Sequence, residues 1–498
     1  MFTIFPGFNL VSKYQSNKKR NSKLNGYIKA SIAAIIALII NFLPTHIFGI
    51  QGLSVVEQRI IAIFVFAAIM WLTEAIPSWC TSVVIIVIML FTISTAGLAP
   101  LQGENGVKYD NLINYKNILW CFADPTIMLF IGGFILAIAL SKVKLDVFLA
   151  KWMLYPFGTK SQSVLLGFIL VTAVFSAFVS NTATAAMMIA FLTPVLKSLP
   201  ADGKGKVALA MAIPLGANLG GIATPIGTPP NTIALGYLNE MLGVSIGFGE
   251  WMLKMVPYVL VMLFIGWGLL LYLFPFKQKE IKLNIEGDFE HSPSTWIVII
   301  TFITTVILWC WPESIAGINT NIGLNSYVIA MLPVGVLCLT GIITRKDLEE
   351  INWSVLWMVA GGFALGVALN SSGLSKHLVE SIPFASWPVI AVMIISGLVC
   401  FGFSNFISHS AAASLLVPVL GVVAGAIQNA TGNEGIAAQL LIGVAIAASV
   451  SMILPISTPP NAIAHSTGMI EQKDMIKVGI IIGFVGLVIG YIWLFLAF

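Results

Sequence analysis

Long apolar segments recur along the whole chain, and they constrain its fold more than any other feature. A helix needs about 20 apolar residues to cross the hydrocarbon core of a bilayer. Segments of this kind predict about 11 transmembrane helices, which we place near 31–48, 56–76, 79–97, 121–141, 207–238, 252–275, 295–312, 323–343, 353–370, 436–468 and 477–497. Only 9% of the residues are charged, against about 25% in soluble domains. The fold class is therefore an all-α polytopic membrane protein, with lipid covering most of its surface.

Two further apolar stretches, 161–198 and 385–425, are interrupted in the middle by polar residues. Each half of such a stretch is shorter than a full span. We interpret both stretches as re-entrant hairpins, which enter and leave the membrane on the same side. The polar residues at the two tips are Ser180, Asn181 and Thr182 in the first hairpin, and Ser408, His409 and Ser410 in the second.

The distribution of basic residues predicts the orientation of the chain. With the amino terminus in the cytoplasm and the side alternating at each span, all but five of the 25 Lys and Arg residues fall in cytoplasmic loops. This bias agrees with the positive-inside rule and leaves the carboxyl terminus outside the cell. The basic run Lys18, Lys19 and Arg20 is then a solvated cytoplasmic tail, and we expect no nucleic-acid partner.

Three segments of the first half return in the second half, in the same order. GlyGlyPhe at 132–134 returns at 361–363, FVSNTATAAMMIA returns as FISHSAAASLLVP, and PIGTPPNTIA returns as PISTPPNAIA. Three repeated segments at nearly constant spacing indicate two homologous halves. We therefore divide the chain into a tail with the first transmembrane helix (1–55), a first repeat (56–275), a cytoplasmic linker (276–294) and a second repeat (295–498).

The two repeats carry opposite orientations in this topology, and each contains one hairpin and one broken helix. The run TPIGTPPN breaks the helix 207–238, because Pro229 and Pro230 cannot continue its hydrogen-bond ladder. A matching run around Pro459 and Pro460 breaks the helix 436–468. Inverted repeats with broken helices are typical of secondary transporters, which bind their substrate where the breaks meet.

The repeated motifs contain no Lys or Arg. An anion bound there would be held by hydroxyls, amides and the positive ends of half-helices, together with Na⁺ ligated by carbonyl and side-chain oxygens. Glu74 and Asp124 lie at predicted helix ends, where we expect capping or packing roles. No motif of a known enzyme class occurs in a credible context, so we expect no enzymatic activity and no resident cofactor.

At these motifs the chain resembles the divalent anion/sodium symporter family, which includes dicarboxylate, citrate and sulfate transporters. The segments MWLTEAIPSWCTS around Glu74 and DPTIMLFIGGFILAIAL from Asp124 share the resemblance. It implies a scaffold domain, a transport domain that moves as an elevator, and a homodimer in the plasma membrane. It also implies one substrate framed by two hairpin tips and two broken helices, between two cation sites.

The resemblance assigns roles to individual positions. The positions that align with substrate contacts are Asn181, Thr182, Thr228, Pro229, His409, Ser410, Thr458 and Pro459. The first Na⁺ site aligns with Ser176, Ser180, Asn181 and Gly227, and the second with Ser404, Ser408 and Ser457.

The second site departs from the family pattern at His409, where the family has Asn. An imidazole can carry positive charge and is a poor ligand for Na⁺, although a neutral ring could also fill the turn as Asn does. We expect exchange of C4 or C5 dicarboxylates, such as succinate, malate, fumarate and 2-oxoglutarate, with weak or no Na⁺ coupling. The alternatives are Na⁺-coupled symport of dicarboxylates or sulfate and, from another class, a cation/proton antiporter or a channel.

Overall fold

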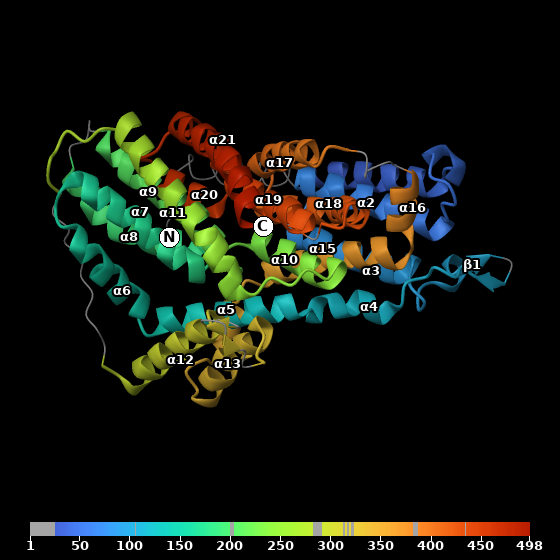
Figure 1. Cartoon of the computed structure of the whole chain (residues 1–498), viewed down its shortest axis with the longest axis horizontal. Coiled ribbons are helices and arrows are strands. Elements are labelled where there is room, and N and C mark those ends of the chain that lie inside the picture. Colours follow the sequence, from blue (N-terminus) through green and yellow to red (C-terminus); the bar gives the residue numbers. More distant parts are fainter. Residues whose placement is uncertain are drawn as a thin grey trace, which may run out of the picture. The chain divides into compact units, whose positions relative to one another are not determined.

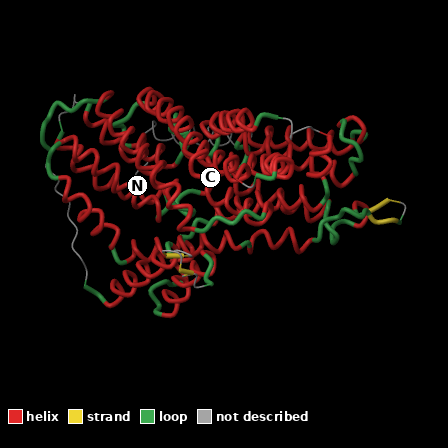
Figure 2. Tube along the Cα trace, viewed as in Figure 1, coloured by secondary structure: helices red, strands yellow, loops and turns green. Residues whose placement is uncertain are grey.

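Helices make up most of the described part of the chain (Figure 2). The computed structural model describes residues 25–104, 106–199, 204–281, 291–311, 314–315, 318–319, 323–381, 387–433 and 435–498. The predicted tail with Lys18, Lys19 and Arg20, and residues 282–290 of the predicted linker, lie outside the described residues. In the described part, ten helices are long and apolar enough to cross a membrane, and the eleven predicted spans all coincide with helices. The predicted polytopic all-α fold is confirmed.

The chain divides into two compact units, which we describe separately. The first unit comprises residues up to Leu119 together with Val367–Ile382. Its elements are a helix over Asn25–Phe42, η1 (Thr45–Phe48), α2 (Val55–Thr73), α3 (Ser78–Thr92), η2 (Ala99–Leu101), β1 (Gly103–Glu104), β2 (Val107–Lys108), most of α4 (Tyr115–Trp120), the end of α15 (Trp353–Ser371) and α16 (Leu374–Ser381). Strands β1 and β2 form an antiparallel pair.

A buried acid organises the start of α2. Ser54 and Glu57 form a capping box, in which each side chain bonds the backbone N–H of the other residue. The second carboxylate oxygen of Glu57 lies 2.9 Å from His377 Nδ1 on α16. Glu57 is only 1% exposed, and neither atom of this contact has another hydrogen-bond partner among the described residues.

The second unit comprises Trp120–Gly366 and Pro383–Phe498 and contains both hairpins and both broken helices. Its first-half elements are η3 (Cys121–Ala123), α5 (Pro125–Lys142), α6 (Leu145–Leu154), η4 (Tyr155–Phe157), α7 (Ser161–Phe178), α8 (Asn181–Ser198), α9 (Gly205–Gly220), η5 (Gly221–Ala223), α10 (Pro229–Leu242) and α11 (Phe248–Leu273). The elements that follow are α12 (Pro293–Trp309), the strand pair β3 (Ser314–Ile315) and β4 (Ile318–Asn319), α13 (Ser326–Leu339), α14 (Arg345–Glu349), the start of α15, α17 (Val389–Phe406), α18 (His409–Thr431), α19 (Gly435–Ser449), α20 (Pro459–Ser466) and α21 (Gln472–Ala497).

The hairpin arms are longer than the sequence pattern suggested. The arms α7, α8 and α17 have 18 residues each, and α18 has 23. By length and composition, α7, α17 and α18 could each cross a membrane, so the expectation of short arms is wrong for these three. The polar tip residues belong to the first turn of the second helix of each hairpin. The apolar runs on both sides therefore remain helical over nearly their whole length. Entry and exit on the same side remains a prediction.

An ion pair joins the two halves at the end of α5. Lys142 Nζ lies 2.6 Å from Asp347 Oδ2, and the same carboxylate caps α14 by accepting from the Thr344 N–H and hydroxyl. Burial opposes ionisation of Asp347, but the hydrogen bonds from Lys142 and Thr344 outweigh it and lower the pKa of the carboxyl to about 2. At the opposite end of α5, Asp124 accepts from the Thr126 N–H at 2.7 Å, which is the expected capping role.

Candidate substrate and cation site

Each hairpin tip is the amino-terminal end of a helix. Ser180 and Ser408 are the N-caps of α8 and α18, and their hydroxyls accept from the backbone N–H of Ala183 and Ala411 at 3.3 Å. The first N–H groups of such a helix have no partner within it and carry partial positive charge. Both tips therefore present a weakly positive surface made without a charged side chain.

The diproline runs break their helices and leave carbonyl groups that side chains must satisfy. In the first half, Asn231 Nδ2 donates to Gly221 O at 3.0 Å and to Thr224 O at 2.8 Å. In the second half, Asn461 Nδ2 donates in the same way to Met452 O at 2.9 Å and to Leu454 O at 3.0 Å. The two breaks are thus held open by equivalent asparagines, as the internal repeat leads one to expect.

The halves interlock in a crossed arrangement. The hairpin helix α8 of the first half contacts α20, the short helix after the second break. Reciprocally, α10 after the first break contacts the hairpin helix α18 of the second half, as the neighbouring α10 and α18 in Figure 1 illustrate. Asn218 on α9 makes the polar link, because its Nδ2 donates to Asn461 Oδ1 at 3.1 Å and to Thr458 Oγ1 at 3.3 Å.

Oxygen atoms converge at the first predicted cation site. Ser176 Oγ lies 2.6 Å from Asn181 Oδ1 and 2.8 Å from Ala217 O, although a single hydroxyl hydrogen can be donated to only one of them at full strength. A Cβ placed on Gly221 would come within 2.9 Å of Asn181 Oδ1 and 3.1 Å of Gly227 O. Three of the four predicted ligands, Ser176, Asn181 and Gly227, therefore lie around Gly221, and the fourth, Ser180, starts the adjoining helix.

The second predicted cation site is arranged differently. Ser457 Oγ donates to Asn405 O at 3.0 Å and accepts from Leu454 N. It therefore links the end of α17 to the backbone of the second helix break. His409 is buried, and its Nε2 lies 2.7 Å from Ser451 O, which makes Nε2 the protonated nitrogen because a carbonyl can only accept.

Ser404 also lacks the role of its first-half counterpart. Its hydroxyl lies 3.7 Å from Cys400 Sγ, and no bond in the described residues joins Ser404 to His409 as Ser176 joins Asn181. The oxygen cluster of the first half thus has no counterpart here.

The predicted substrate contacts fall into two groups. Thr458 Oγ1 accepts from Asn461 N and Asn218 Nδ2, so its oxygen is engaged in the link between the halves. The hydroxyls of Thr182, Thr228 and Ser410 make no hydrogen bond to any described residue and can donate to a ligand. Pro229 and Pro459 start the helices α10 and α20.

Asn218 and Asn405 were missed in the sequence analysis. Both are buried in apolar surroundings, and Asn405 bonds Phe401 O and the N–H of Ile453 across the second break. An amide inside a predicted span was the available signal, since such a group must find partners away from water.

The sequence pattern of the citrate transporter family matches residues 68–434. The chain belongs to this family. An uncharacterized transporter of Haemophilus influenzae is 33% identical over 446 residues, which cover 86% of this chain and 89% of that protein. The sodium-dependent dicarboxylate transporter SdcS of Staphylococcus saprophyticus is 28% identical, over 95% of this chain and 92% of that protein. These relatives confirm the resemblance stated above, and this member of the citrate transporter family is a multi-pass membrane transporter and not an enzyme.

The fold has been seen in solved structures of other transporters. The structure of Neisseria gonorrhoeae MtrF, described with a class of antimetabolite efflux pumps, superposes with a TM-score of 0.52 and 13% identity. The match covers 89% of this chain and 95% of that one. At this identity the likeness concerns the fold alone.

Proposed function

We propose that the protein carries C4 or C5 dicarboxylates across the membrane by secondary active transport. The observation that carries this proposal is the crossed packing of two hairpin helices on two broken helices, with Asn218 bonded to Asn461 between the halves. We expect the helix N-termini and the hydroxyls of Thr182, Thr228 and Ser410 to converge on the substrate there. Donors of this kind hold a carboxylate without a fixed positive charge, which permits its release.

The first cation site is proposed to bind Na⁺ through Ser176, Ser180, Asn181 and Gly227. Na⁺ requires oxygen ligands, and the short contacts from Ser176 Oγ to two other acceptor oxygens support such a cluster. A cation there would relieve the crowding of acceptors and add positive charge beside the substrate. The name of the relative SdcS is consistent with a coupled Na⁺ ion.

The second cation site is proposed to be weakened by His409. Its ring replaces an amide oxygen, and its Nε2 is engaged with Ser451 O. With one cation site impaired, the protein would exchange one dicarboxylate for another with weak or no Na⁺ coupling. The runner-up is Na⁺-coupled symport of dicarboxylates or sulfate, which the name of SdcS favours.

Transport in proteoliposomes tests the proposal. Vesicles loaded with succinate should take up labelled succinate at a similar rate with and without a Na⁺ gradient, and unlabelled malate or fumarate should compete better than sulfate. Steep Na⁺ dependence with more than one ion per substrate would favour the symporter. Na⁺ movement driven by pH without any organic anion would replace the proposal with an antiporter.

The proposal also covers the oligomeric state of the protein and its orientation in the membrane. The chain would act as a homodimer in the plasma membrane, with a cytoplasmic amino terminus and an extracellular carboxyl terminus, and a transport domain would move as an elevator. Cysteine labelling from one side of the membrane tests the orientation, and cross-linking of single-cysteine variants tests the dimer.

A further inference from the structure

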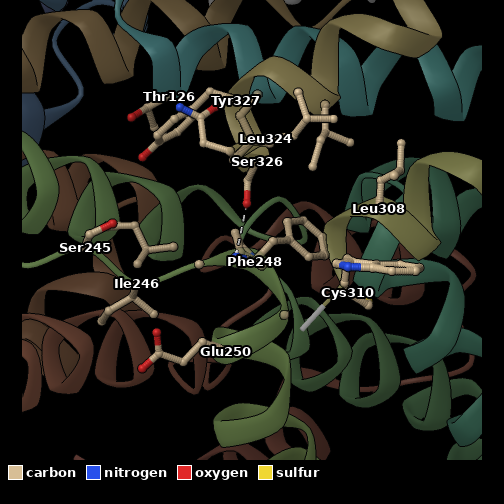
Figure 3. Close-up of a pocket in the computed structure, with 18 of the residues that line it drawn as sticks. Thr126, Ser245, Ile246, Phe248, Glu250, Leu308, Cys310, Leu324, Ser326 and Tyr327 are labelled. Carbon is tan, nitrogen blue, oxygen red and sulfur yellow. Dashed lines mark hydrogen bonds between the residues drawn. The ribbon is translucent and has the colours of Figure 1, made fainter. Parts of the chain in front are cut away.

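A cavity of about 800 Å³ opens in the second unit at the start of α11. It is enclosed by the start of α5, the loop between α10 and α11, the end of α12 and the start of α13 (Figure 3). Its described lining includes none of the residues predicted to bind substrate or cation, although Pro225 of the first helix break is part of it. A volume in this range accommodates a small organic molecule.

One side of the cavity carries hydroxyl groups. Thr126 is only 1% exposed, and its hydroxyl lies beside Tyr327 in Figure 3. Tyr327 accepts from Asn239 Nδ2 at 3.1 Å, and Ser326 Oγ accepts from Phe248 N at 3.2 Å. Hydroxyl oxygens have a second lone pair, so this side of the cavity can accept a hydrogen bond from a ligand.

The charges around the cavity are mostly negative. Glu250 is part of the lining, and one of its oxygens lies 2.8 Å from Lys254. Lys254 also sits over the ring of Phe498, at 3.8 Å from its centre. Asp124 and Glu240 are both close enough to act electrostatically on Tyr327. Glu250 is the one carboxylate in the described lining, and the two acids near Tyr327 add to the negative charge, so the side-chain charges favour a cationic ligand over a dicarboxylate.

The opposite side of the cavity is apolar. Leu308, Trp311 and Leu324 line it, next to Phe248, whose ring stacks on Trp309 with the centres 4.4 Å apart. In Figure 3, Leu308 lies on the far side of the cavity from Thr126, Ser245 and Glu250. The lining is therefore polar and acidic at one end and apolar at the other.

We propose that this cavity is a second ligand site, which binds an amphipathic organic cation. The ammonium group would lie toward Glu250, and the apolar body would lie against Leu308 and Trp311. The occupant would touch α5, α12 and α13 on one side and α10 and α11 on the other. It would therefore oppose any movement between these helices and inhibit transport without competing with substrate, a consequence that rests on the function proposed above.

Three probes with one body and different charges test the binding itself. Titration calorimetry on the purified full chain compares 4-phenylbutylamine, 4-phenylbutanol and 5-phenylpentanoate, which differ only in the head group. The amine should bind most tightly, and binding of the acid should be undetectable. Equal binding of the amine and the acid would overturn the proposal, because the cavity would then be selecting for apolar surface alone.

Substitutions at two glutamates test whether Glu250 binds the ammonium group of the ligand. Glu250→Gln should weaken amine binding about fivefold, the size expected for a partly exposed ion pair. The control is Glu380→Gln, since Glu380 is also half-exposed and also pairs with a Lys one helical turn away. If both variants bind the amine as the native chain does, or both lose it equally, Glu250 does not receive the ammonium group.

A cavity-filling variant separates this proposal from the proposed transport function. Ser245→Trp should abolish amine binding, while succinate binding and the melting temperature stay as in the native chain. In proteoliposomes, the amine should slow succinate exchange by the same fraction at low and high succinate concentration. Absence of succinate transport would refute the proposed function but leave the calorimetric result intact, whereas undiminished amine binding by Ser245→Trp would refute the second site.

Discussion

Asn218 donates its side-chain amide to Asn461 across the internal repeat, and the reciprocal bond does not exist. At the repeat spacing seen for the diproline runs, the counterpart of Asn218 is Ala448, which has no amide to offer Asn231. Asn231 Oδ1 is accordingly buried without a hydrogen-bond partner in the described part of the chain. Each half has a hairpin followed by a broken helix, but the halves differ at the polar contacts where substrate and cations are expected.

Replacing Asn218 by Ala should destabilise the protein and slow transport. The change leaves Asn461 Oδ1 buried without its donor, which costs about 1–3 kcal/mol. We expect a melting temperature lower by several degrees in detergent and a loss of succinate uptake. Thr193→Val is the control, because the Thr193 hydroxyl bonds only its own helix, at Ile189 O. Equal melting temperatures for the two variants would mean that the link between the halves is unimportant.

Replacing His409 by Asn should increase the stimulation of transport by Na⁺. The substitution returns an amide oxygen to the second cation site and removes the ring from Ser451 O. Succinate uptake measured over a range of Na⁺ concentrations should then rise more steeply than in the native chain. His465→Asn is the matched control, since His465 also contacts a backbone carbonyl, Ile470 O at 2.9 Å. An unchanged Na⁺ response in His409→Asn would contradict the assigned role of the imidazole.

Replacing Gly221 by Ala should impair the first cation site. The added methyl group would lie 2.9 Å from Asn181 Oδ1, closer than real Cβ contacts, and 3.1 Å from Gly227 O, which is tighter than most such contacts. We expect a loss of Na⁺-dependent thermal stabilisation and at least a tenfold loss of uptake. Gly268→Ala on α11 is the control, because nothing lies within 4 Å of that position. Normal Na⁺ binding in Gly221→Ala would place the ion elsewhere.

The ion pair between Lys142 and Asp347 should make stability depend on pH in the acid range. The pKa of Asp347 is lowered to about 2 in the folded protein from an ordinary value of 3.8. A lowered carboxyl pKa stabilises the fold fully above the unfolded value, and this contribution is lost as the pH falls from about 4 to about 2. Asp347→Asn should therefore lower the melting temperature at pH 7 and have little effect at pH 2.

A double-mutant cycle with Lys142→Gln identifies the partner. If Lys142 supplies the stabilisation, the double variant should melt close to the less stable single variant, because the two groups act through one contact. Additive losses in melting temperature would show that the Thr344 capping bonds alone stabilise ionised Asp347.

The amino-acid sequence by itself determined the membrane fold and the helix breaks. Apolar length, paired prolines and polar interruptions act locally, so each can be recognised without knowing what packs against it. The repeated motifs also pointed to Ser176, Asn181 and Gly227, which the structure places around Gly221. The arm lengths were less predictable, because a polar residue can end an apolar run or begin the next helix.

Only the tertiary structure decided which residues meet. The crossed contacts of α8 with α20 and of α10 with α18 join segments far apart in the sequence, and no local pattern encodes them. Asn218 could be recognised as a buried amide, but its acceptor on Asn461 depends on how α9 and α20 pack. The same is true of His409, whose ring contacts Ser451 O, and of the acidic cavity beside Glu250. Hydrogen bonds and electrostatic fields depend on distances in space, which a linear sequence specifies only through the complete fold.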